Sequence, residues 1–204
     1  MFIRIYNENP NIKEIKKAVD VLKNDGVIIY PTDSVYAFGC NIFSSKALER
    51  IAQIKHLDPQ KAHFSLIFYD LSQISNYTNP LDNELFKLLK RNLPGPFTFI
   101  LEANTNVPKM LKMNKKKTIG IRIPDNNIAR SIVYELGNPI FTTSVIEDDD
   151  IIEYMTDPEL IHEKYSDMVD LVIDGGFGNL VASAIVDCTG GKVEVTREGA
   201  VELK

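Results

Sequence analysis

The sequence lacks the residues and patterns that mark several common classes of protein. Its 204 residues include two cysteines, three histidines and no tryptophan. Two cysteines are too few for a disulfide framework, and no C-x-x-C or H-E-x-x-H pattern indicates a zinc site. No apolar run is long enough to span a bilayer, and no long apolar segment follows the N-terminus as in a signal peptide. We therefore expect a soluble, cytoplasmic protein without a structural metal, in which Cys40 and Cys188 are small buried hydrophobic residues.

Common nucleotide-binding and hydrolase signatures are also absent. The chain contains no G-x-x-x-x-G-K-[ST], no G-x-G-x-x-G and no G-x-S-x-G. A P-loop NTPase, a Rossmann dehydrogenase and a typical α/β-hydrolase are therefore not supported. The net charge of -5 does not favour the wrapping of nucleic acid, although local basic patches can still bind it. One basic run contains Lys112, Lys115, Lys116 and Lys117, and a solvated loop is its simpler interpretation.

Short apolar runs alternate along the chain with segments whose apolar residues recur at helical spacing. Predicted helices begin after Asn11, at Ser44 or Ser45, near Leu81, near Ile128 and at Asp157. This alternation predicts an α/β protein with a largely parallel or mixed sheet and helices against it. No break in composition marks a linker, so a single domain over residues 1–204 is expected. The predicted strands are residues 27–30, 64–68, 97–101, 118–123, 140–143, 169–173, 184–186 and 193–196.

Polar and charged residues gather where the predicted strands end. The predicted loop at residues 31–39 reads P-T-D-S-V-Y-A-F-G and puts hydroxyls, a carboxylate and a phenol after a strand. Ligands of open α/β sheets bind beyond the strand ends, but a Pro-Asp turn with local capping explains the loop equally well. Arg122 lies in an otherwise apolar strand, so it either pairs with an internal carboxylate or faces a ligand anion. Lys55, Lys61 and Arg197 are further cations near element ends, and lysine and arginine suit phosphates and carboxylates.

These segments, in their order along the chain, resemble the motifs of a known family. Residues 31–39 resemble the P-T-[DE]-[TS]-V-Y-G-L-G signature of the YrdC/YciO family of threonylcarbamoyl-AMP synthases, and the YciO branch is the more similar. Each motif alone is weak, but the ordered set is specific and covers nearly the whole chain. The other matching blocks, in family order, are Lys55 and residues 94–99, 118–124, 143–144, 174–176, 183–187 and 197–199.

The resemblance implies a fold and a reaction. The fold would be a single YrdC-like domain over residues 1–204, with a twisted open mixed sheet, helices on its faces and a large concave cavity. The reaction would be that of a nucleotidyltransferase, in which L-threonine, bicarbonate and ATP give threonylcarbamoyl-AMP and pyrophosphate for tRNA modification. Mg²⁺ would be carried with ATP. Some family members bind double-stranded RNA, so tRNA or double-stranded RNA is a further implied partner.

The resemblance also assigns roles by motif position. Arg122 would bind the carboxylate of the amino acid, and Lys55 is the candidate catalytic residue. The residues assigned to L-threonine are Ser34, Arg122, Ser144 and Ser183. Those assigned to the nucleotide are Lys55, Lys61, Thr118 and Arg197, and further candidates are Thr32, Tyr36 and Thr143.

Two positions depart from the family pattern. Residues 55–59 read K-H-L-D-P where the family has K-x-R-P, so Leu57 stands in place of an arginine. Residues 144–146 read S-V-I where the family has S-x-N, so Ile146 stands in place of an asparagine. A charge-assisted contact contributes about 1.5–3 kcal/mol, so both losses would weaken ATP use by orders of magnitude. The alternatives are a weakly active or non-catalytic RNA-binding relative, or a loop that delivers Lys61 or His63 to the phosphates instead.

Overall fold

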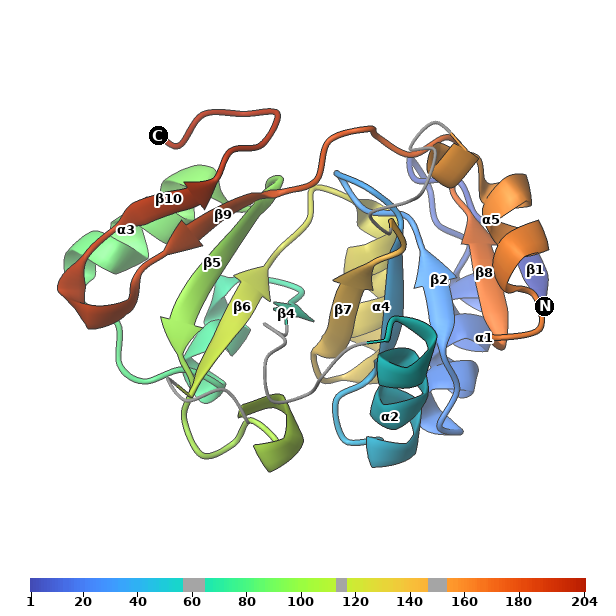
Figure 1. Ribbon diagram of the computed structural model, residues 1–204, viewed down its shortest axis with the longest axis horizontal. Helices are drawn as coiled ribbons and strands as arrows, with labels where there is room; N and C mark the ends of the chain where they lie inside the picture. Colours follow the sequence, from blue (N-terminus) through green and yellow to red (C-terminus); the bar gives the residue numbers. More distant parts are fainter. Residues whose placement is uncertain (57–64, 113–116, 147–153) are drawn as a thin grey trace.

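Ten strands of the described residues join one mixed sheet, which confirms the predicted fold class. The computed structural model describes residues 1–56, 65–112, 117–146 and 154–204. The strand order is β1-β8-β2-β3-β7-β4-β6-β5-β9-β10, and the sheet is open and twisted (Figure 1). The strands are β1 (Phe2–Arg4), β2 (Ile28–Tyr30), β3 (Ala37–Asn41), β4 (Ser65–Ile67), β5 (Phe97–Glu102), β6 (Thr118–Arg122), β7 (Ile140–Ser144), β8 (Leu171–Asp174), β9 (Ala184–Asp187) and β10 (Glu194–Arg197).

The sheet combines parallel and antiparallel pairs. Strands β1 and β2 lie parallel to β8, β4 lies parallel to β6, and β5 lies parallel to β9. The other neighbouring pairs are antiparallel, including β2 with β3 and β9 with β10. Because parallel neighbours need crossover connections, the helices between strands are carried onto the faces of the sheet.

Five α-helices of the described residues pack against the sheet, and capping residues set their ends. Asn11 caps α1 by accepting a hydrogen bond from the backbone N–H of Lys13, and Gly137 ends α4 with a left-handed φ of 83°. None of the helices in these ranges is long and apolar enough to cross a bilayer. The helices are α1 (Ile12–Lys23), α2 (Ser45–Ile54), α3 (Asn83–Asn92), α4 (Asn127–Leu136) and α5 (Pro158–Tyr165), and the 3₁₀ turns are η1 (Leu71–Asn76), η2 (Lys109–Lys112), η3 (Tyr154–Thr156) and η4 (Thr189–Gly191).

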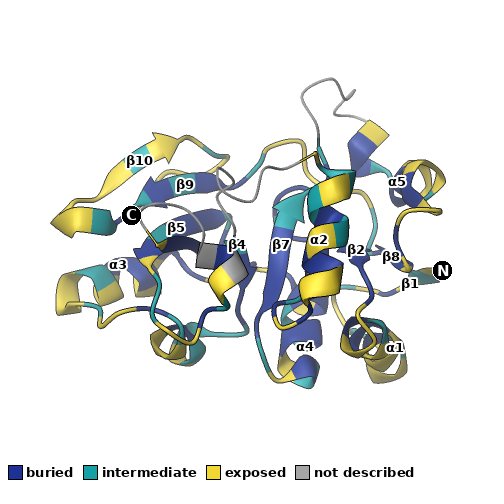
Figure 2. Ribbon diagram, turned by 60° about the horizontal axis from the view of Figure 1, so that its bottom comes forward, coloured by how far each residue is buried: buried dark blue, intermediate teal, exposed yellow. Residues whose placement is uncertain are grey.

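Alternation along the strands divides the core into two apolar clusters. Ile28 and Tyr30 belong to the cluster that α1 and α4 cover, whereas Ile29 between them belongs to the other cluster. Helices α2, α3 and α5 contribute to this second cluster. Figure 1 shows α1 and α4 on the far side of the sheet and α2 on the near side, and Figure 2 shows that one face of α2 is buried and the other exposed. The same alternation decides which strand side chains are available to a ligand.

The structure corrects the sequence prediction at residues 37–41. These residues form β3 and pair with both β2 and β7, so the loop predicted at residues 31–39 is shorter. Residues 37–40 read A-F-G-C and contain no β-branched side chain, so this strand is stabilised by pairing and burial rather than by intrinsic propensity. Strand β1 was also not predicted, because its residues are mostly exposed and do not form a buried apolar run. The predicted helices and the remaining predicted strands are present.

Both cysteines are buried and free, as predicted. Burial raises the pKa of the Cys188 thiol from 9.0 to about 12, and the neighbouring Asp187 adds to this rise. The raised pKa lowers the thiolate population at pH 8, and the thiolate is the reactive form. We therefore expect both cysteines to react with a thiol reagent only after denaturant is added. Rapid labelling of Cys188 in the native protein at pH 8 would contradict this prediction.

Candidate functional site

A cavity of about 170 Å³ lies where several strands end. Ser34 reaches it from the loop after β2, Ser183 precedes β9, and the last residues of β6, β7 and β10 complete its lining. These last residues are Arg122, Ser144 and Arg197. The cavity is smaller than the roughly 300–1,000 Å³ of pockets for drug-sized ligands. The part of it that the described residues line therefore suits a small metabolite.

One face of the central sheet forms the floor of this cavity. The strand register places Thr142 of β7, Ser65 of β4 and Gly120 of β6 beside one another on adjacent strands, so all three point to the same face. A Cβ at Gly120 would lie 2.4 Å from Oγ of Ser65 and 2.9 Å from Cγ2 of Thr98. The glycine therefore leaves room between small hydroxyl side chains.

Arg122 is a buried cation in the lining of the cavity. Its Nη2 donates hydrogen bonds to Oδ1 of Asp33 at 3.1 Å and to Oγ of Ser34 at 2.9 Å. The side chains of Arg122 and Asp33 are each 8% exposed. The Nε of Arg122 is buried and has no hydrogen-bond partner among the described residues. Both alternatives left open by the sequence are thus compatible with the geometry, because Arg122 pairs with an internal carboxylate and also lines the cavity.

Arg197 is the second arginine of the lining. Its Nε and Nη2 donate to the backbone carbonyl of Ser183 at 3.1 Å and 2.8 Å, and the Oγ of Ser183 lies 2.8 Å from Oγ1 of Thr98. Burial, and then the positive charge of Arg122, lower the pKa of Arg197. The two arginines are therefore close enough to repel each other. Since Asp33 offers one carboxylate against two guanidinium groups, the cavity favours an anionic ligand.

Tyr30 supports the floor from the neighbouring strand. Its hydroxyl donates to Oγ1 of Thr142 at 2.8 Å, and burial raises the pKa of Tyr30 well above its ordinary value. The ring passes over Gly39, where a Cβ would lie 2.7 Å from Cε1 of Tyr30. Because Thr142 accepts this hydrogen bond, its own hydroxyl hydrogen remains available to a ligand.

Thr32 and Tyr36 stabilise the loops and do not line the cavity in the described structure. The Oγ1 of Thr32 accepts from the backbone N–H of Ser34 at 3.0 Å and donates to the carbonyl of Val35 at 2.8 Å. The hydroxyl of Tyr36 accepts from the N–H of Gly175 and donates to the carbonyl of Gly176. Local capping therefore explains the hydroxyl of Thr32, as one interpretation of the sequence proposed.

Two of the residues assigned to the nucleotide lie away from the cavity lining of the described chain. Lys55 follows α2, and its Nζ donates to the carbonyl of Ile146 at 2.8 Å, which joins this helix to the end of β7. Thr118 is buried at the start of β6. Thr118 and Arg122 are four residues apart on one strand, or about 13 Å. Lys61 lies outside the described residues.

One of the two departures from the family pattern can be located. The half-buried side chain of Ile146 packs against the second apolar cluster, and its N–H donates to Oγ of Ser144 at 3.0 Å. An isoleucine here therefore contributes to the core rather than a polar group to the cavity. Leu57 and His63 lie outside the described residues.

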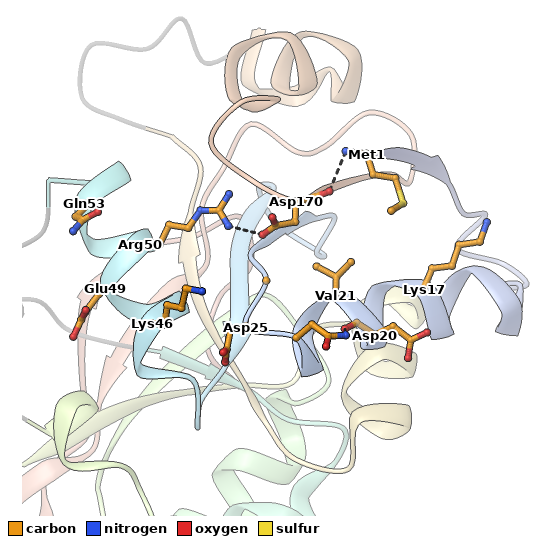
Figure 3. Close-up of a pocket in the computed structure, with 12 residues that line it drawn as sticks. Met1, Lys17, Asp20, Val21, Asp25, Lys46, Glu49, Arg50, Gln53 and Asp170 are labelled. Carbon is orange, nitrogen blue, oxygen red and sulfur yellow. Dashed lines mark hydrogen bonds and ion pairs between the residues drawn. The ribbon is translucent and has the colours of Figure 1, made fainter.

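A larger cavity of about 720 Å³ contains none of the predicted site residues. It lies between α1, α2 and the start of β8, and in Figure 3 Lys46 and Arg50 extend from α2 towards it. Asp170 accepts from Arg50 at 2.6 Å and from the backbone N–H of Val27 at 2.8 Å. The lining contains Lys17, Lys46, Arg50 and the Met1 amine against Asp20, Asp25, Glu49 and Asp170, so its charges balance. We take the smaller cavity as the candidate site, although it has the smaller volume, because positive charge is concentrated in its lining.

The described part of the chain shows no group of three or more His, Cys, Asp or Glu side chains placed to hold a metal ion. Near the cavity, Asp33 uses Oδ1 for Arg122 and Oδ2 for the backbone N–H of Asp125. The cavity therefore offers a ligand guanidinium groups and hydroxyls rather than a set of carboxylates.

Several polar residues of the lining were not predicted from the sequence. Ser65, Thr98 and Thr142 were given no role, and Thr143 was a further candidate that does line the cavity. Thr98 and Thr142 are buried polar residues within apolar strands. That pattern made Arg122 conspicuous, and it could have drawn attention to these threonines as well.

An open mixed sheet with two arginines and several hydroxyls over one face gives a site whose charge and size suit a small anionic ligand. The family model for Sua5, YciO and YrdC, described as "Telomere recombination", matches residues 20–199. The chain therefore belongs to this family. YciO of Escherichia coli (strain K12) is 40% identical over 204 residues, which are all of this chain and 97% of that protein.

Solved structures agree with this membership. The crystal structure of E. coli YciO superimposes with a TM-score of 0.92 and covers the whole chain and 98% of its own. P. abyssi Sua5 complexed with L-threonine has the same fold, with a TM-score of 0.85 at 22% identity, and this chain matches 58% of it. The threonylcarbamoyl-AMP synthase of Coxiella burnetii (strain RSA 493 / Nine Mile phase I) is 26% identical over 166 residues, which are 81% of this chain and 87% of that protein.

Proposed function

We propose that this chain binds L-threonine in the small cavity and converts it, with bicarbonate and Mg-ATP, to threonylcarbamoyl-AMP and pyrophosphate. The observation that carries the proposal is the convergence of two arginines and several hydroxyls on this cavity in a member of the family. Two relatives support it by their descriptions, one as a threonylcarbamoyl-AMP synthase and one as a complex with L-threonine. The product would then serve the modification of tRNA.

Arg122 would hold the carboxylate of L-threonine. Its Nε has no partner in the described chain, and a guanidinium group matches the planar geometry of a carboxylate. Ser34, Ser144 and Ser183 would offer hydroxyls to the amine and the side chain of threonine. These groups lie on separate strands and loops, so a ligand that binds all of them is fixed in one orientation.

The cations at and beyond the cavity would hold the nucleotide. Arg197 lines the cavity with Arg122, Lys55 lies beside the end of β7, and Thr118 lies farther along β6. The triphosphate of Mg-ATP would be neutralised by Lys55, Lys61 and Arg197, with Mg²⁺ held by the phosphates of the substrate. Thr118 would contact the nucleotide at the greater distance from the amino-acid site.

The chemistry requires positioning more than acid–base groups. Bicarbonate would take up a proton and lose water to give carbon dioxide. The neutral threonine amine would then attack this carbon and release one proton, which balances the proton taken up. Two nearby guanidinium groups lower the pKa of the ammonium ion and so favour the neutral amine. A carbamate oxygen then attacks the α-phosphorus, the bond to the β-phosphate oxygen breaks, and pyrophosphate leaves. Lys55 would stabilise the negative charge that develops on the phosphates. No side chain needs to form a covalent bond with the substrate.

A weakly active relative with a role in binding tRNA or double-stranded RNA is the second candidate. The position of Ile146 favours it, because an apolar side chain packs on the core where the family has an asparagine. A chain that keeps its inward arginines and hydroxyls but lacks that amide would retain threonine binding and lose ATP chemistry.

Incubation with labelled bicarbonate, L-threonine and Mg-ATP tests the two candidates. The synthase proposal predicts labelled threonylcarbamoyl adenylate, formation of pyrophosphate and dependence on all three substrates. Threonine binding without adenylate, with binding to tRNA in a filter assay, would favour the weakly active relative. If L-threonine does not bind at millimolar concentration, both candidates fail, since both use the same amino-acid site.

A further inference from the structure

Three loops of the protein meet at Asp33. Its Oδ1 accepts from Nη2 of Arg122 at 3.1 Å, and its Oδ2 accepts from the backbone N–H of Asp125 at 2.8 Å, just beyond β6. The Nδ2 of Asn179 donates to the carbonyl of Asp33 at 3.0 Å, and the N–H of Asn179 donates to the carbonyl of Ser34 at 3.1 Å. The loop after β2 is therefore fixed to the segment after β6 and to the loop between β8 and β9.

The two oxygens of the Asp33 carboxylate have different partners, but both contacts restrict the position of Arg122. One oxygen fixes the terminal nitrogen of the Arg122 guanidinium, and the other fixes the backbone three residues after that arginine. The Asp33 side chain itself is 8% exposed, although Asp125 lies at the surface. A guanidinium that is held at Nη2 can rotate neither about its own bonds nor away from the cavity without breaking the ion pair.

We propose that Asp33 is a positioning residue that orients Arg122, so that the part of its guanidinium group that lines the cavity is presented to the carboxylate of an α-amino acid. This inference rests on the proposed function for its ligand, but not for the orientation of the arginine itself. Ser34 takes part in the same arrangement, because its Oγ accepts from the same Nη2 at 2.9 Å. The consecutive residues Asp33 and Ser34 thus both bind Nη2, and Nε is left without a partner in the described chain.

Selectivity for the carboxylate would follow from this arrangement. An arginine whose orientation is fixed by an internal carboxylate binds a second, planar anion at a lower entropic cost than a mobile arginine does. A ligand that lacks the carboxylate, such as L-threoninamide, gains nothing from that orientation. The ratio of the two affinities therefore reports the positioning of Arg122, whereas a general loss of folding would lower both.

The test compares Asp33→Asn with wild type by calorimetric titration with L-threonine and with L-threoninamide. We expect L-threonine to bind at least about tenfold more weakly to the variant, as the loss of about 1.4 kcal/mol from one oriented charged contact predicts. The affinity for L-threoninamide should stay within about twofold. Asp170→Asn is the matched control, because Asp170 also pairs with an arginine and a backbone N–H but lies away from this cavity. The control should keep both affinities.

A second measurement follows the side chain of Arg122 without ligand. In wild type, NMR of ¹⁵N-labelled arginine should show a guanidinium of Arg122 with slowly rotating Nη groups, and in Asp33→Asn this rotation should become fast. An unchanged affinity ratio together with unchanged rotation would overturn the proposal. Equal weakening of both ligands with a lower melting temperature would also overturn it in favour of a structural role. If wild type binds no L-threonine, the proposed function fails, and the rotation of Arg122 alone then decides the role of Asp33.

Discussion

An Arg122→Ala variant should bind L-threonine at least about 30-fold more weakly than wild type, because truncating one partner of a buried charge contact typically costs about 2–5 kcal/mol. Arg122 would be the group that neutralises the ligand carboxylate, and its Nε has no other partner in the described chain. Isothermal titration calorimetry of the purified variant measures the effect directly. An affinity equal to that of wild type would show that the carboxylate is bound elsewhere.

The same variant should also be less stable, which calls for a control. Removing Arg122 leaves Asp33 buried without a cation, a change that typically costs about 3–5 kcal/mol. A second variant that combines Arg122→Ala with Asp33→Asn should recover much of the stability, because no uncompensated charge remains. It should not recover L-threonine binding. The comparison of the two variants therefore separates a defect in folding from a defect in binding.

The loss of stability of the Arg122→Ala variant, relative to wild type, should depend on pH. Burial raises the pKa of Asp33 above 3.8 in the folded protein, and the charge of Arg122 opposes this rise. Without Arg122 the pKa of Asp33 rises further. A carboxyl group with a raised pKa binds its proton more tightly in the folded state, so stability is lost as pH rises from 3.8 through the folded pKa. Thermal unfolding of the variant should thus move to lower temperature above that range, relative to wild type.

The sequence predicts most of the fold because the strands and helices are marked by local features. Asn11 and Ser44 cap helices at the predicted positions, and Gly137 ends α4 as expected. Strand β3 was not predicted, because it contains no β-branched residue and one of its two pairing partners, β7, is about 100 positions away in the chain. Long-range pairing is the information that composition and periodicity do not contain.

The candidate site could likewise be predicted from the sequence only in part. The convergence of residues at strand ends, such as Arg122 and Ser144, on one cavity could be predicted, although β6 and β7 run antiparallel and end toward opposite edges of the sheet. The partners that control their chemistry could not. Asp33 and Arg122 are 89 positions apart, and the hydroxyl of Tyr30 reaches Thr142 over 112 positions. Each contact depends on the register of several strands at once, and the second also on the absence of a side chain at Gly39.

Restoring the two residues in which the chain departs from its family should raise adenylate formation. We expect slow turnover in wild type, because Leu57 and Ile146 supply no polar contact to the nucleotide. Each substitution, Leu57→Arg or Ile146→Asn, would regain a contact of about 1.5–3 kcal/mol, or roughly tenfold to a hundredfold in rate. Leu57 is outside the described residues, so its part of the prediction rests on the sequence pattern. The readout is labelled threonylcarbamoyl adenylate formed per minute.

The structure shows which contacts of Ile146 its substitution would keep and which it would lose. Its backbone carbonyl holds Nζ of Lys55 at 2.8 Å, and its N–H bonds Ser144, so neither contact depends on the side chain. Ile146→Asn should keep both and lose apolar packing, with a cost of about 1–2 kcal/mol in stability. Ile146→Ala is the control, since it loses similar packing without adding an amide. A rise in rate with Asn but not with Ala would identify the amide as the cause.

The double variant distinguishes a weakened nucleotide site from a rerouted loop. If both new groups contact the same bound nucleotide, the gain of Leu57→Arg with Ile146→Asn should exceed the product of the single gains, because neighbouring sites couple. A loop that already delivers Lys61 or His63 to the phosphates would make wild type active and leave the double variant without gain. Wild-type turnover equal to that of the Coxiella burnetii synthase under the same conditions would contradict the weakened site. Lys61→Ala should then lower that turnover, since a lysine near the phosphates would carry the charge that the missing arginine does not.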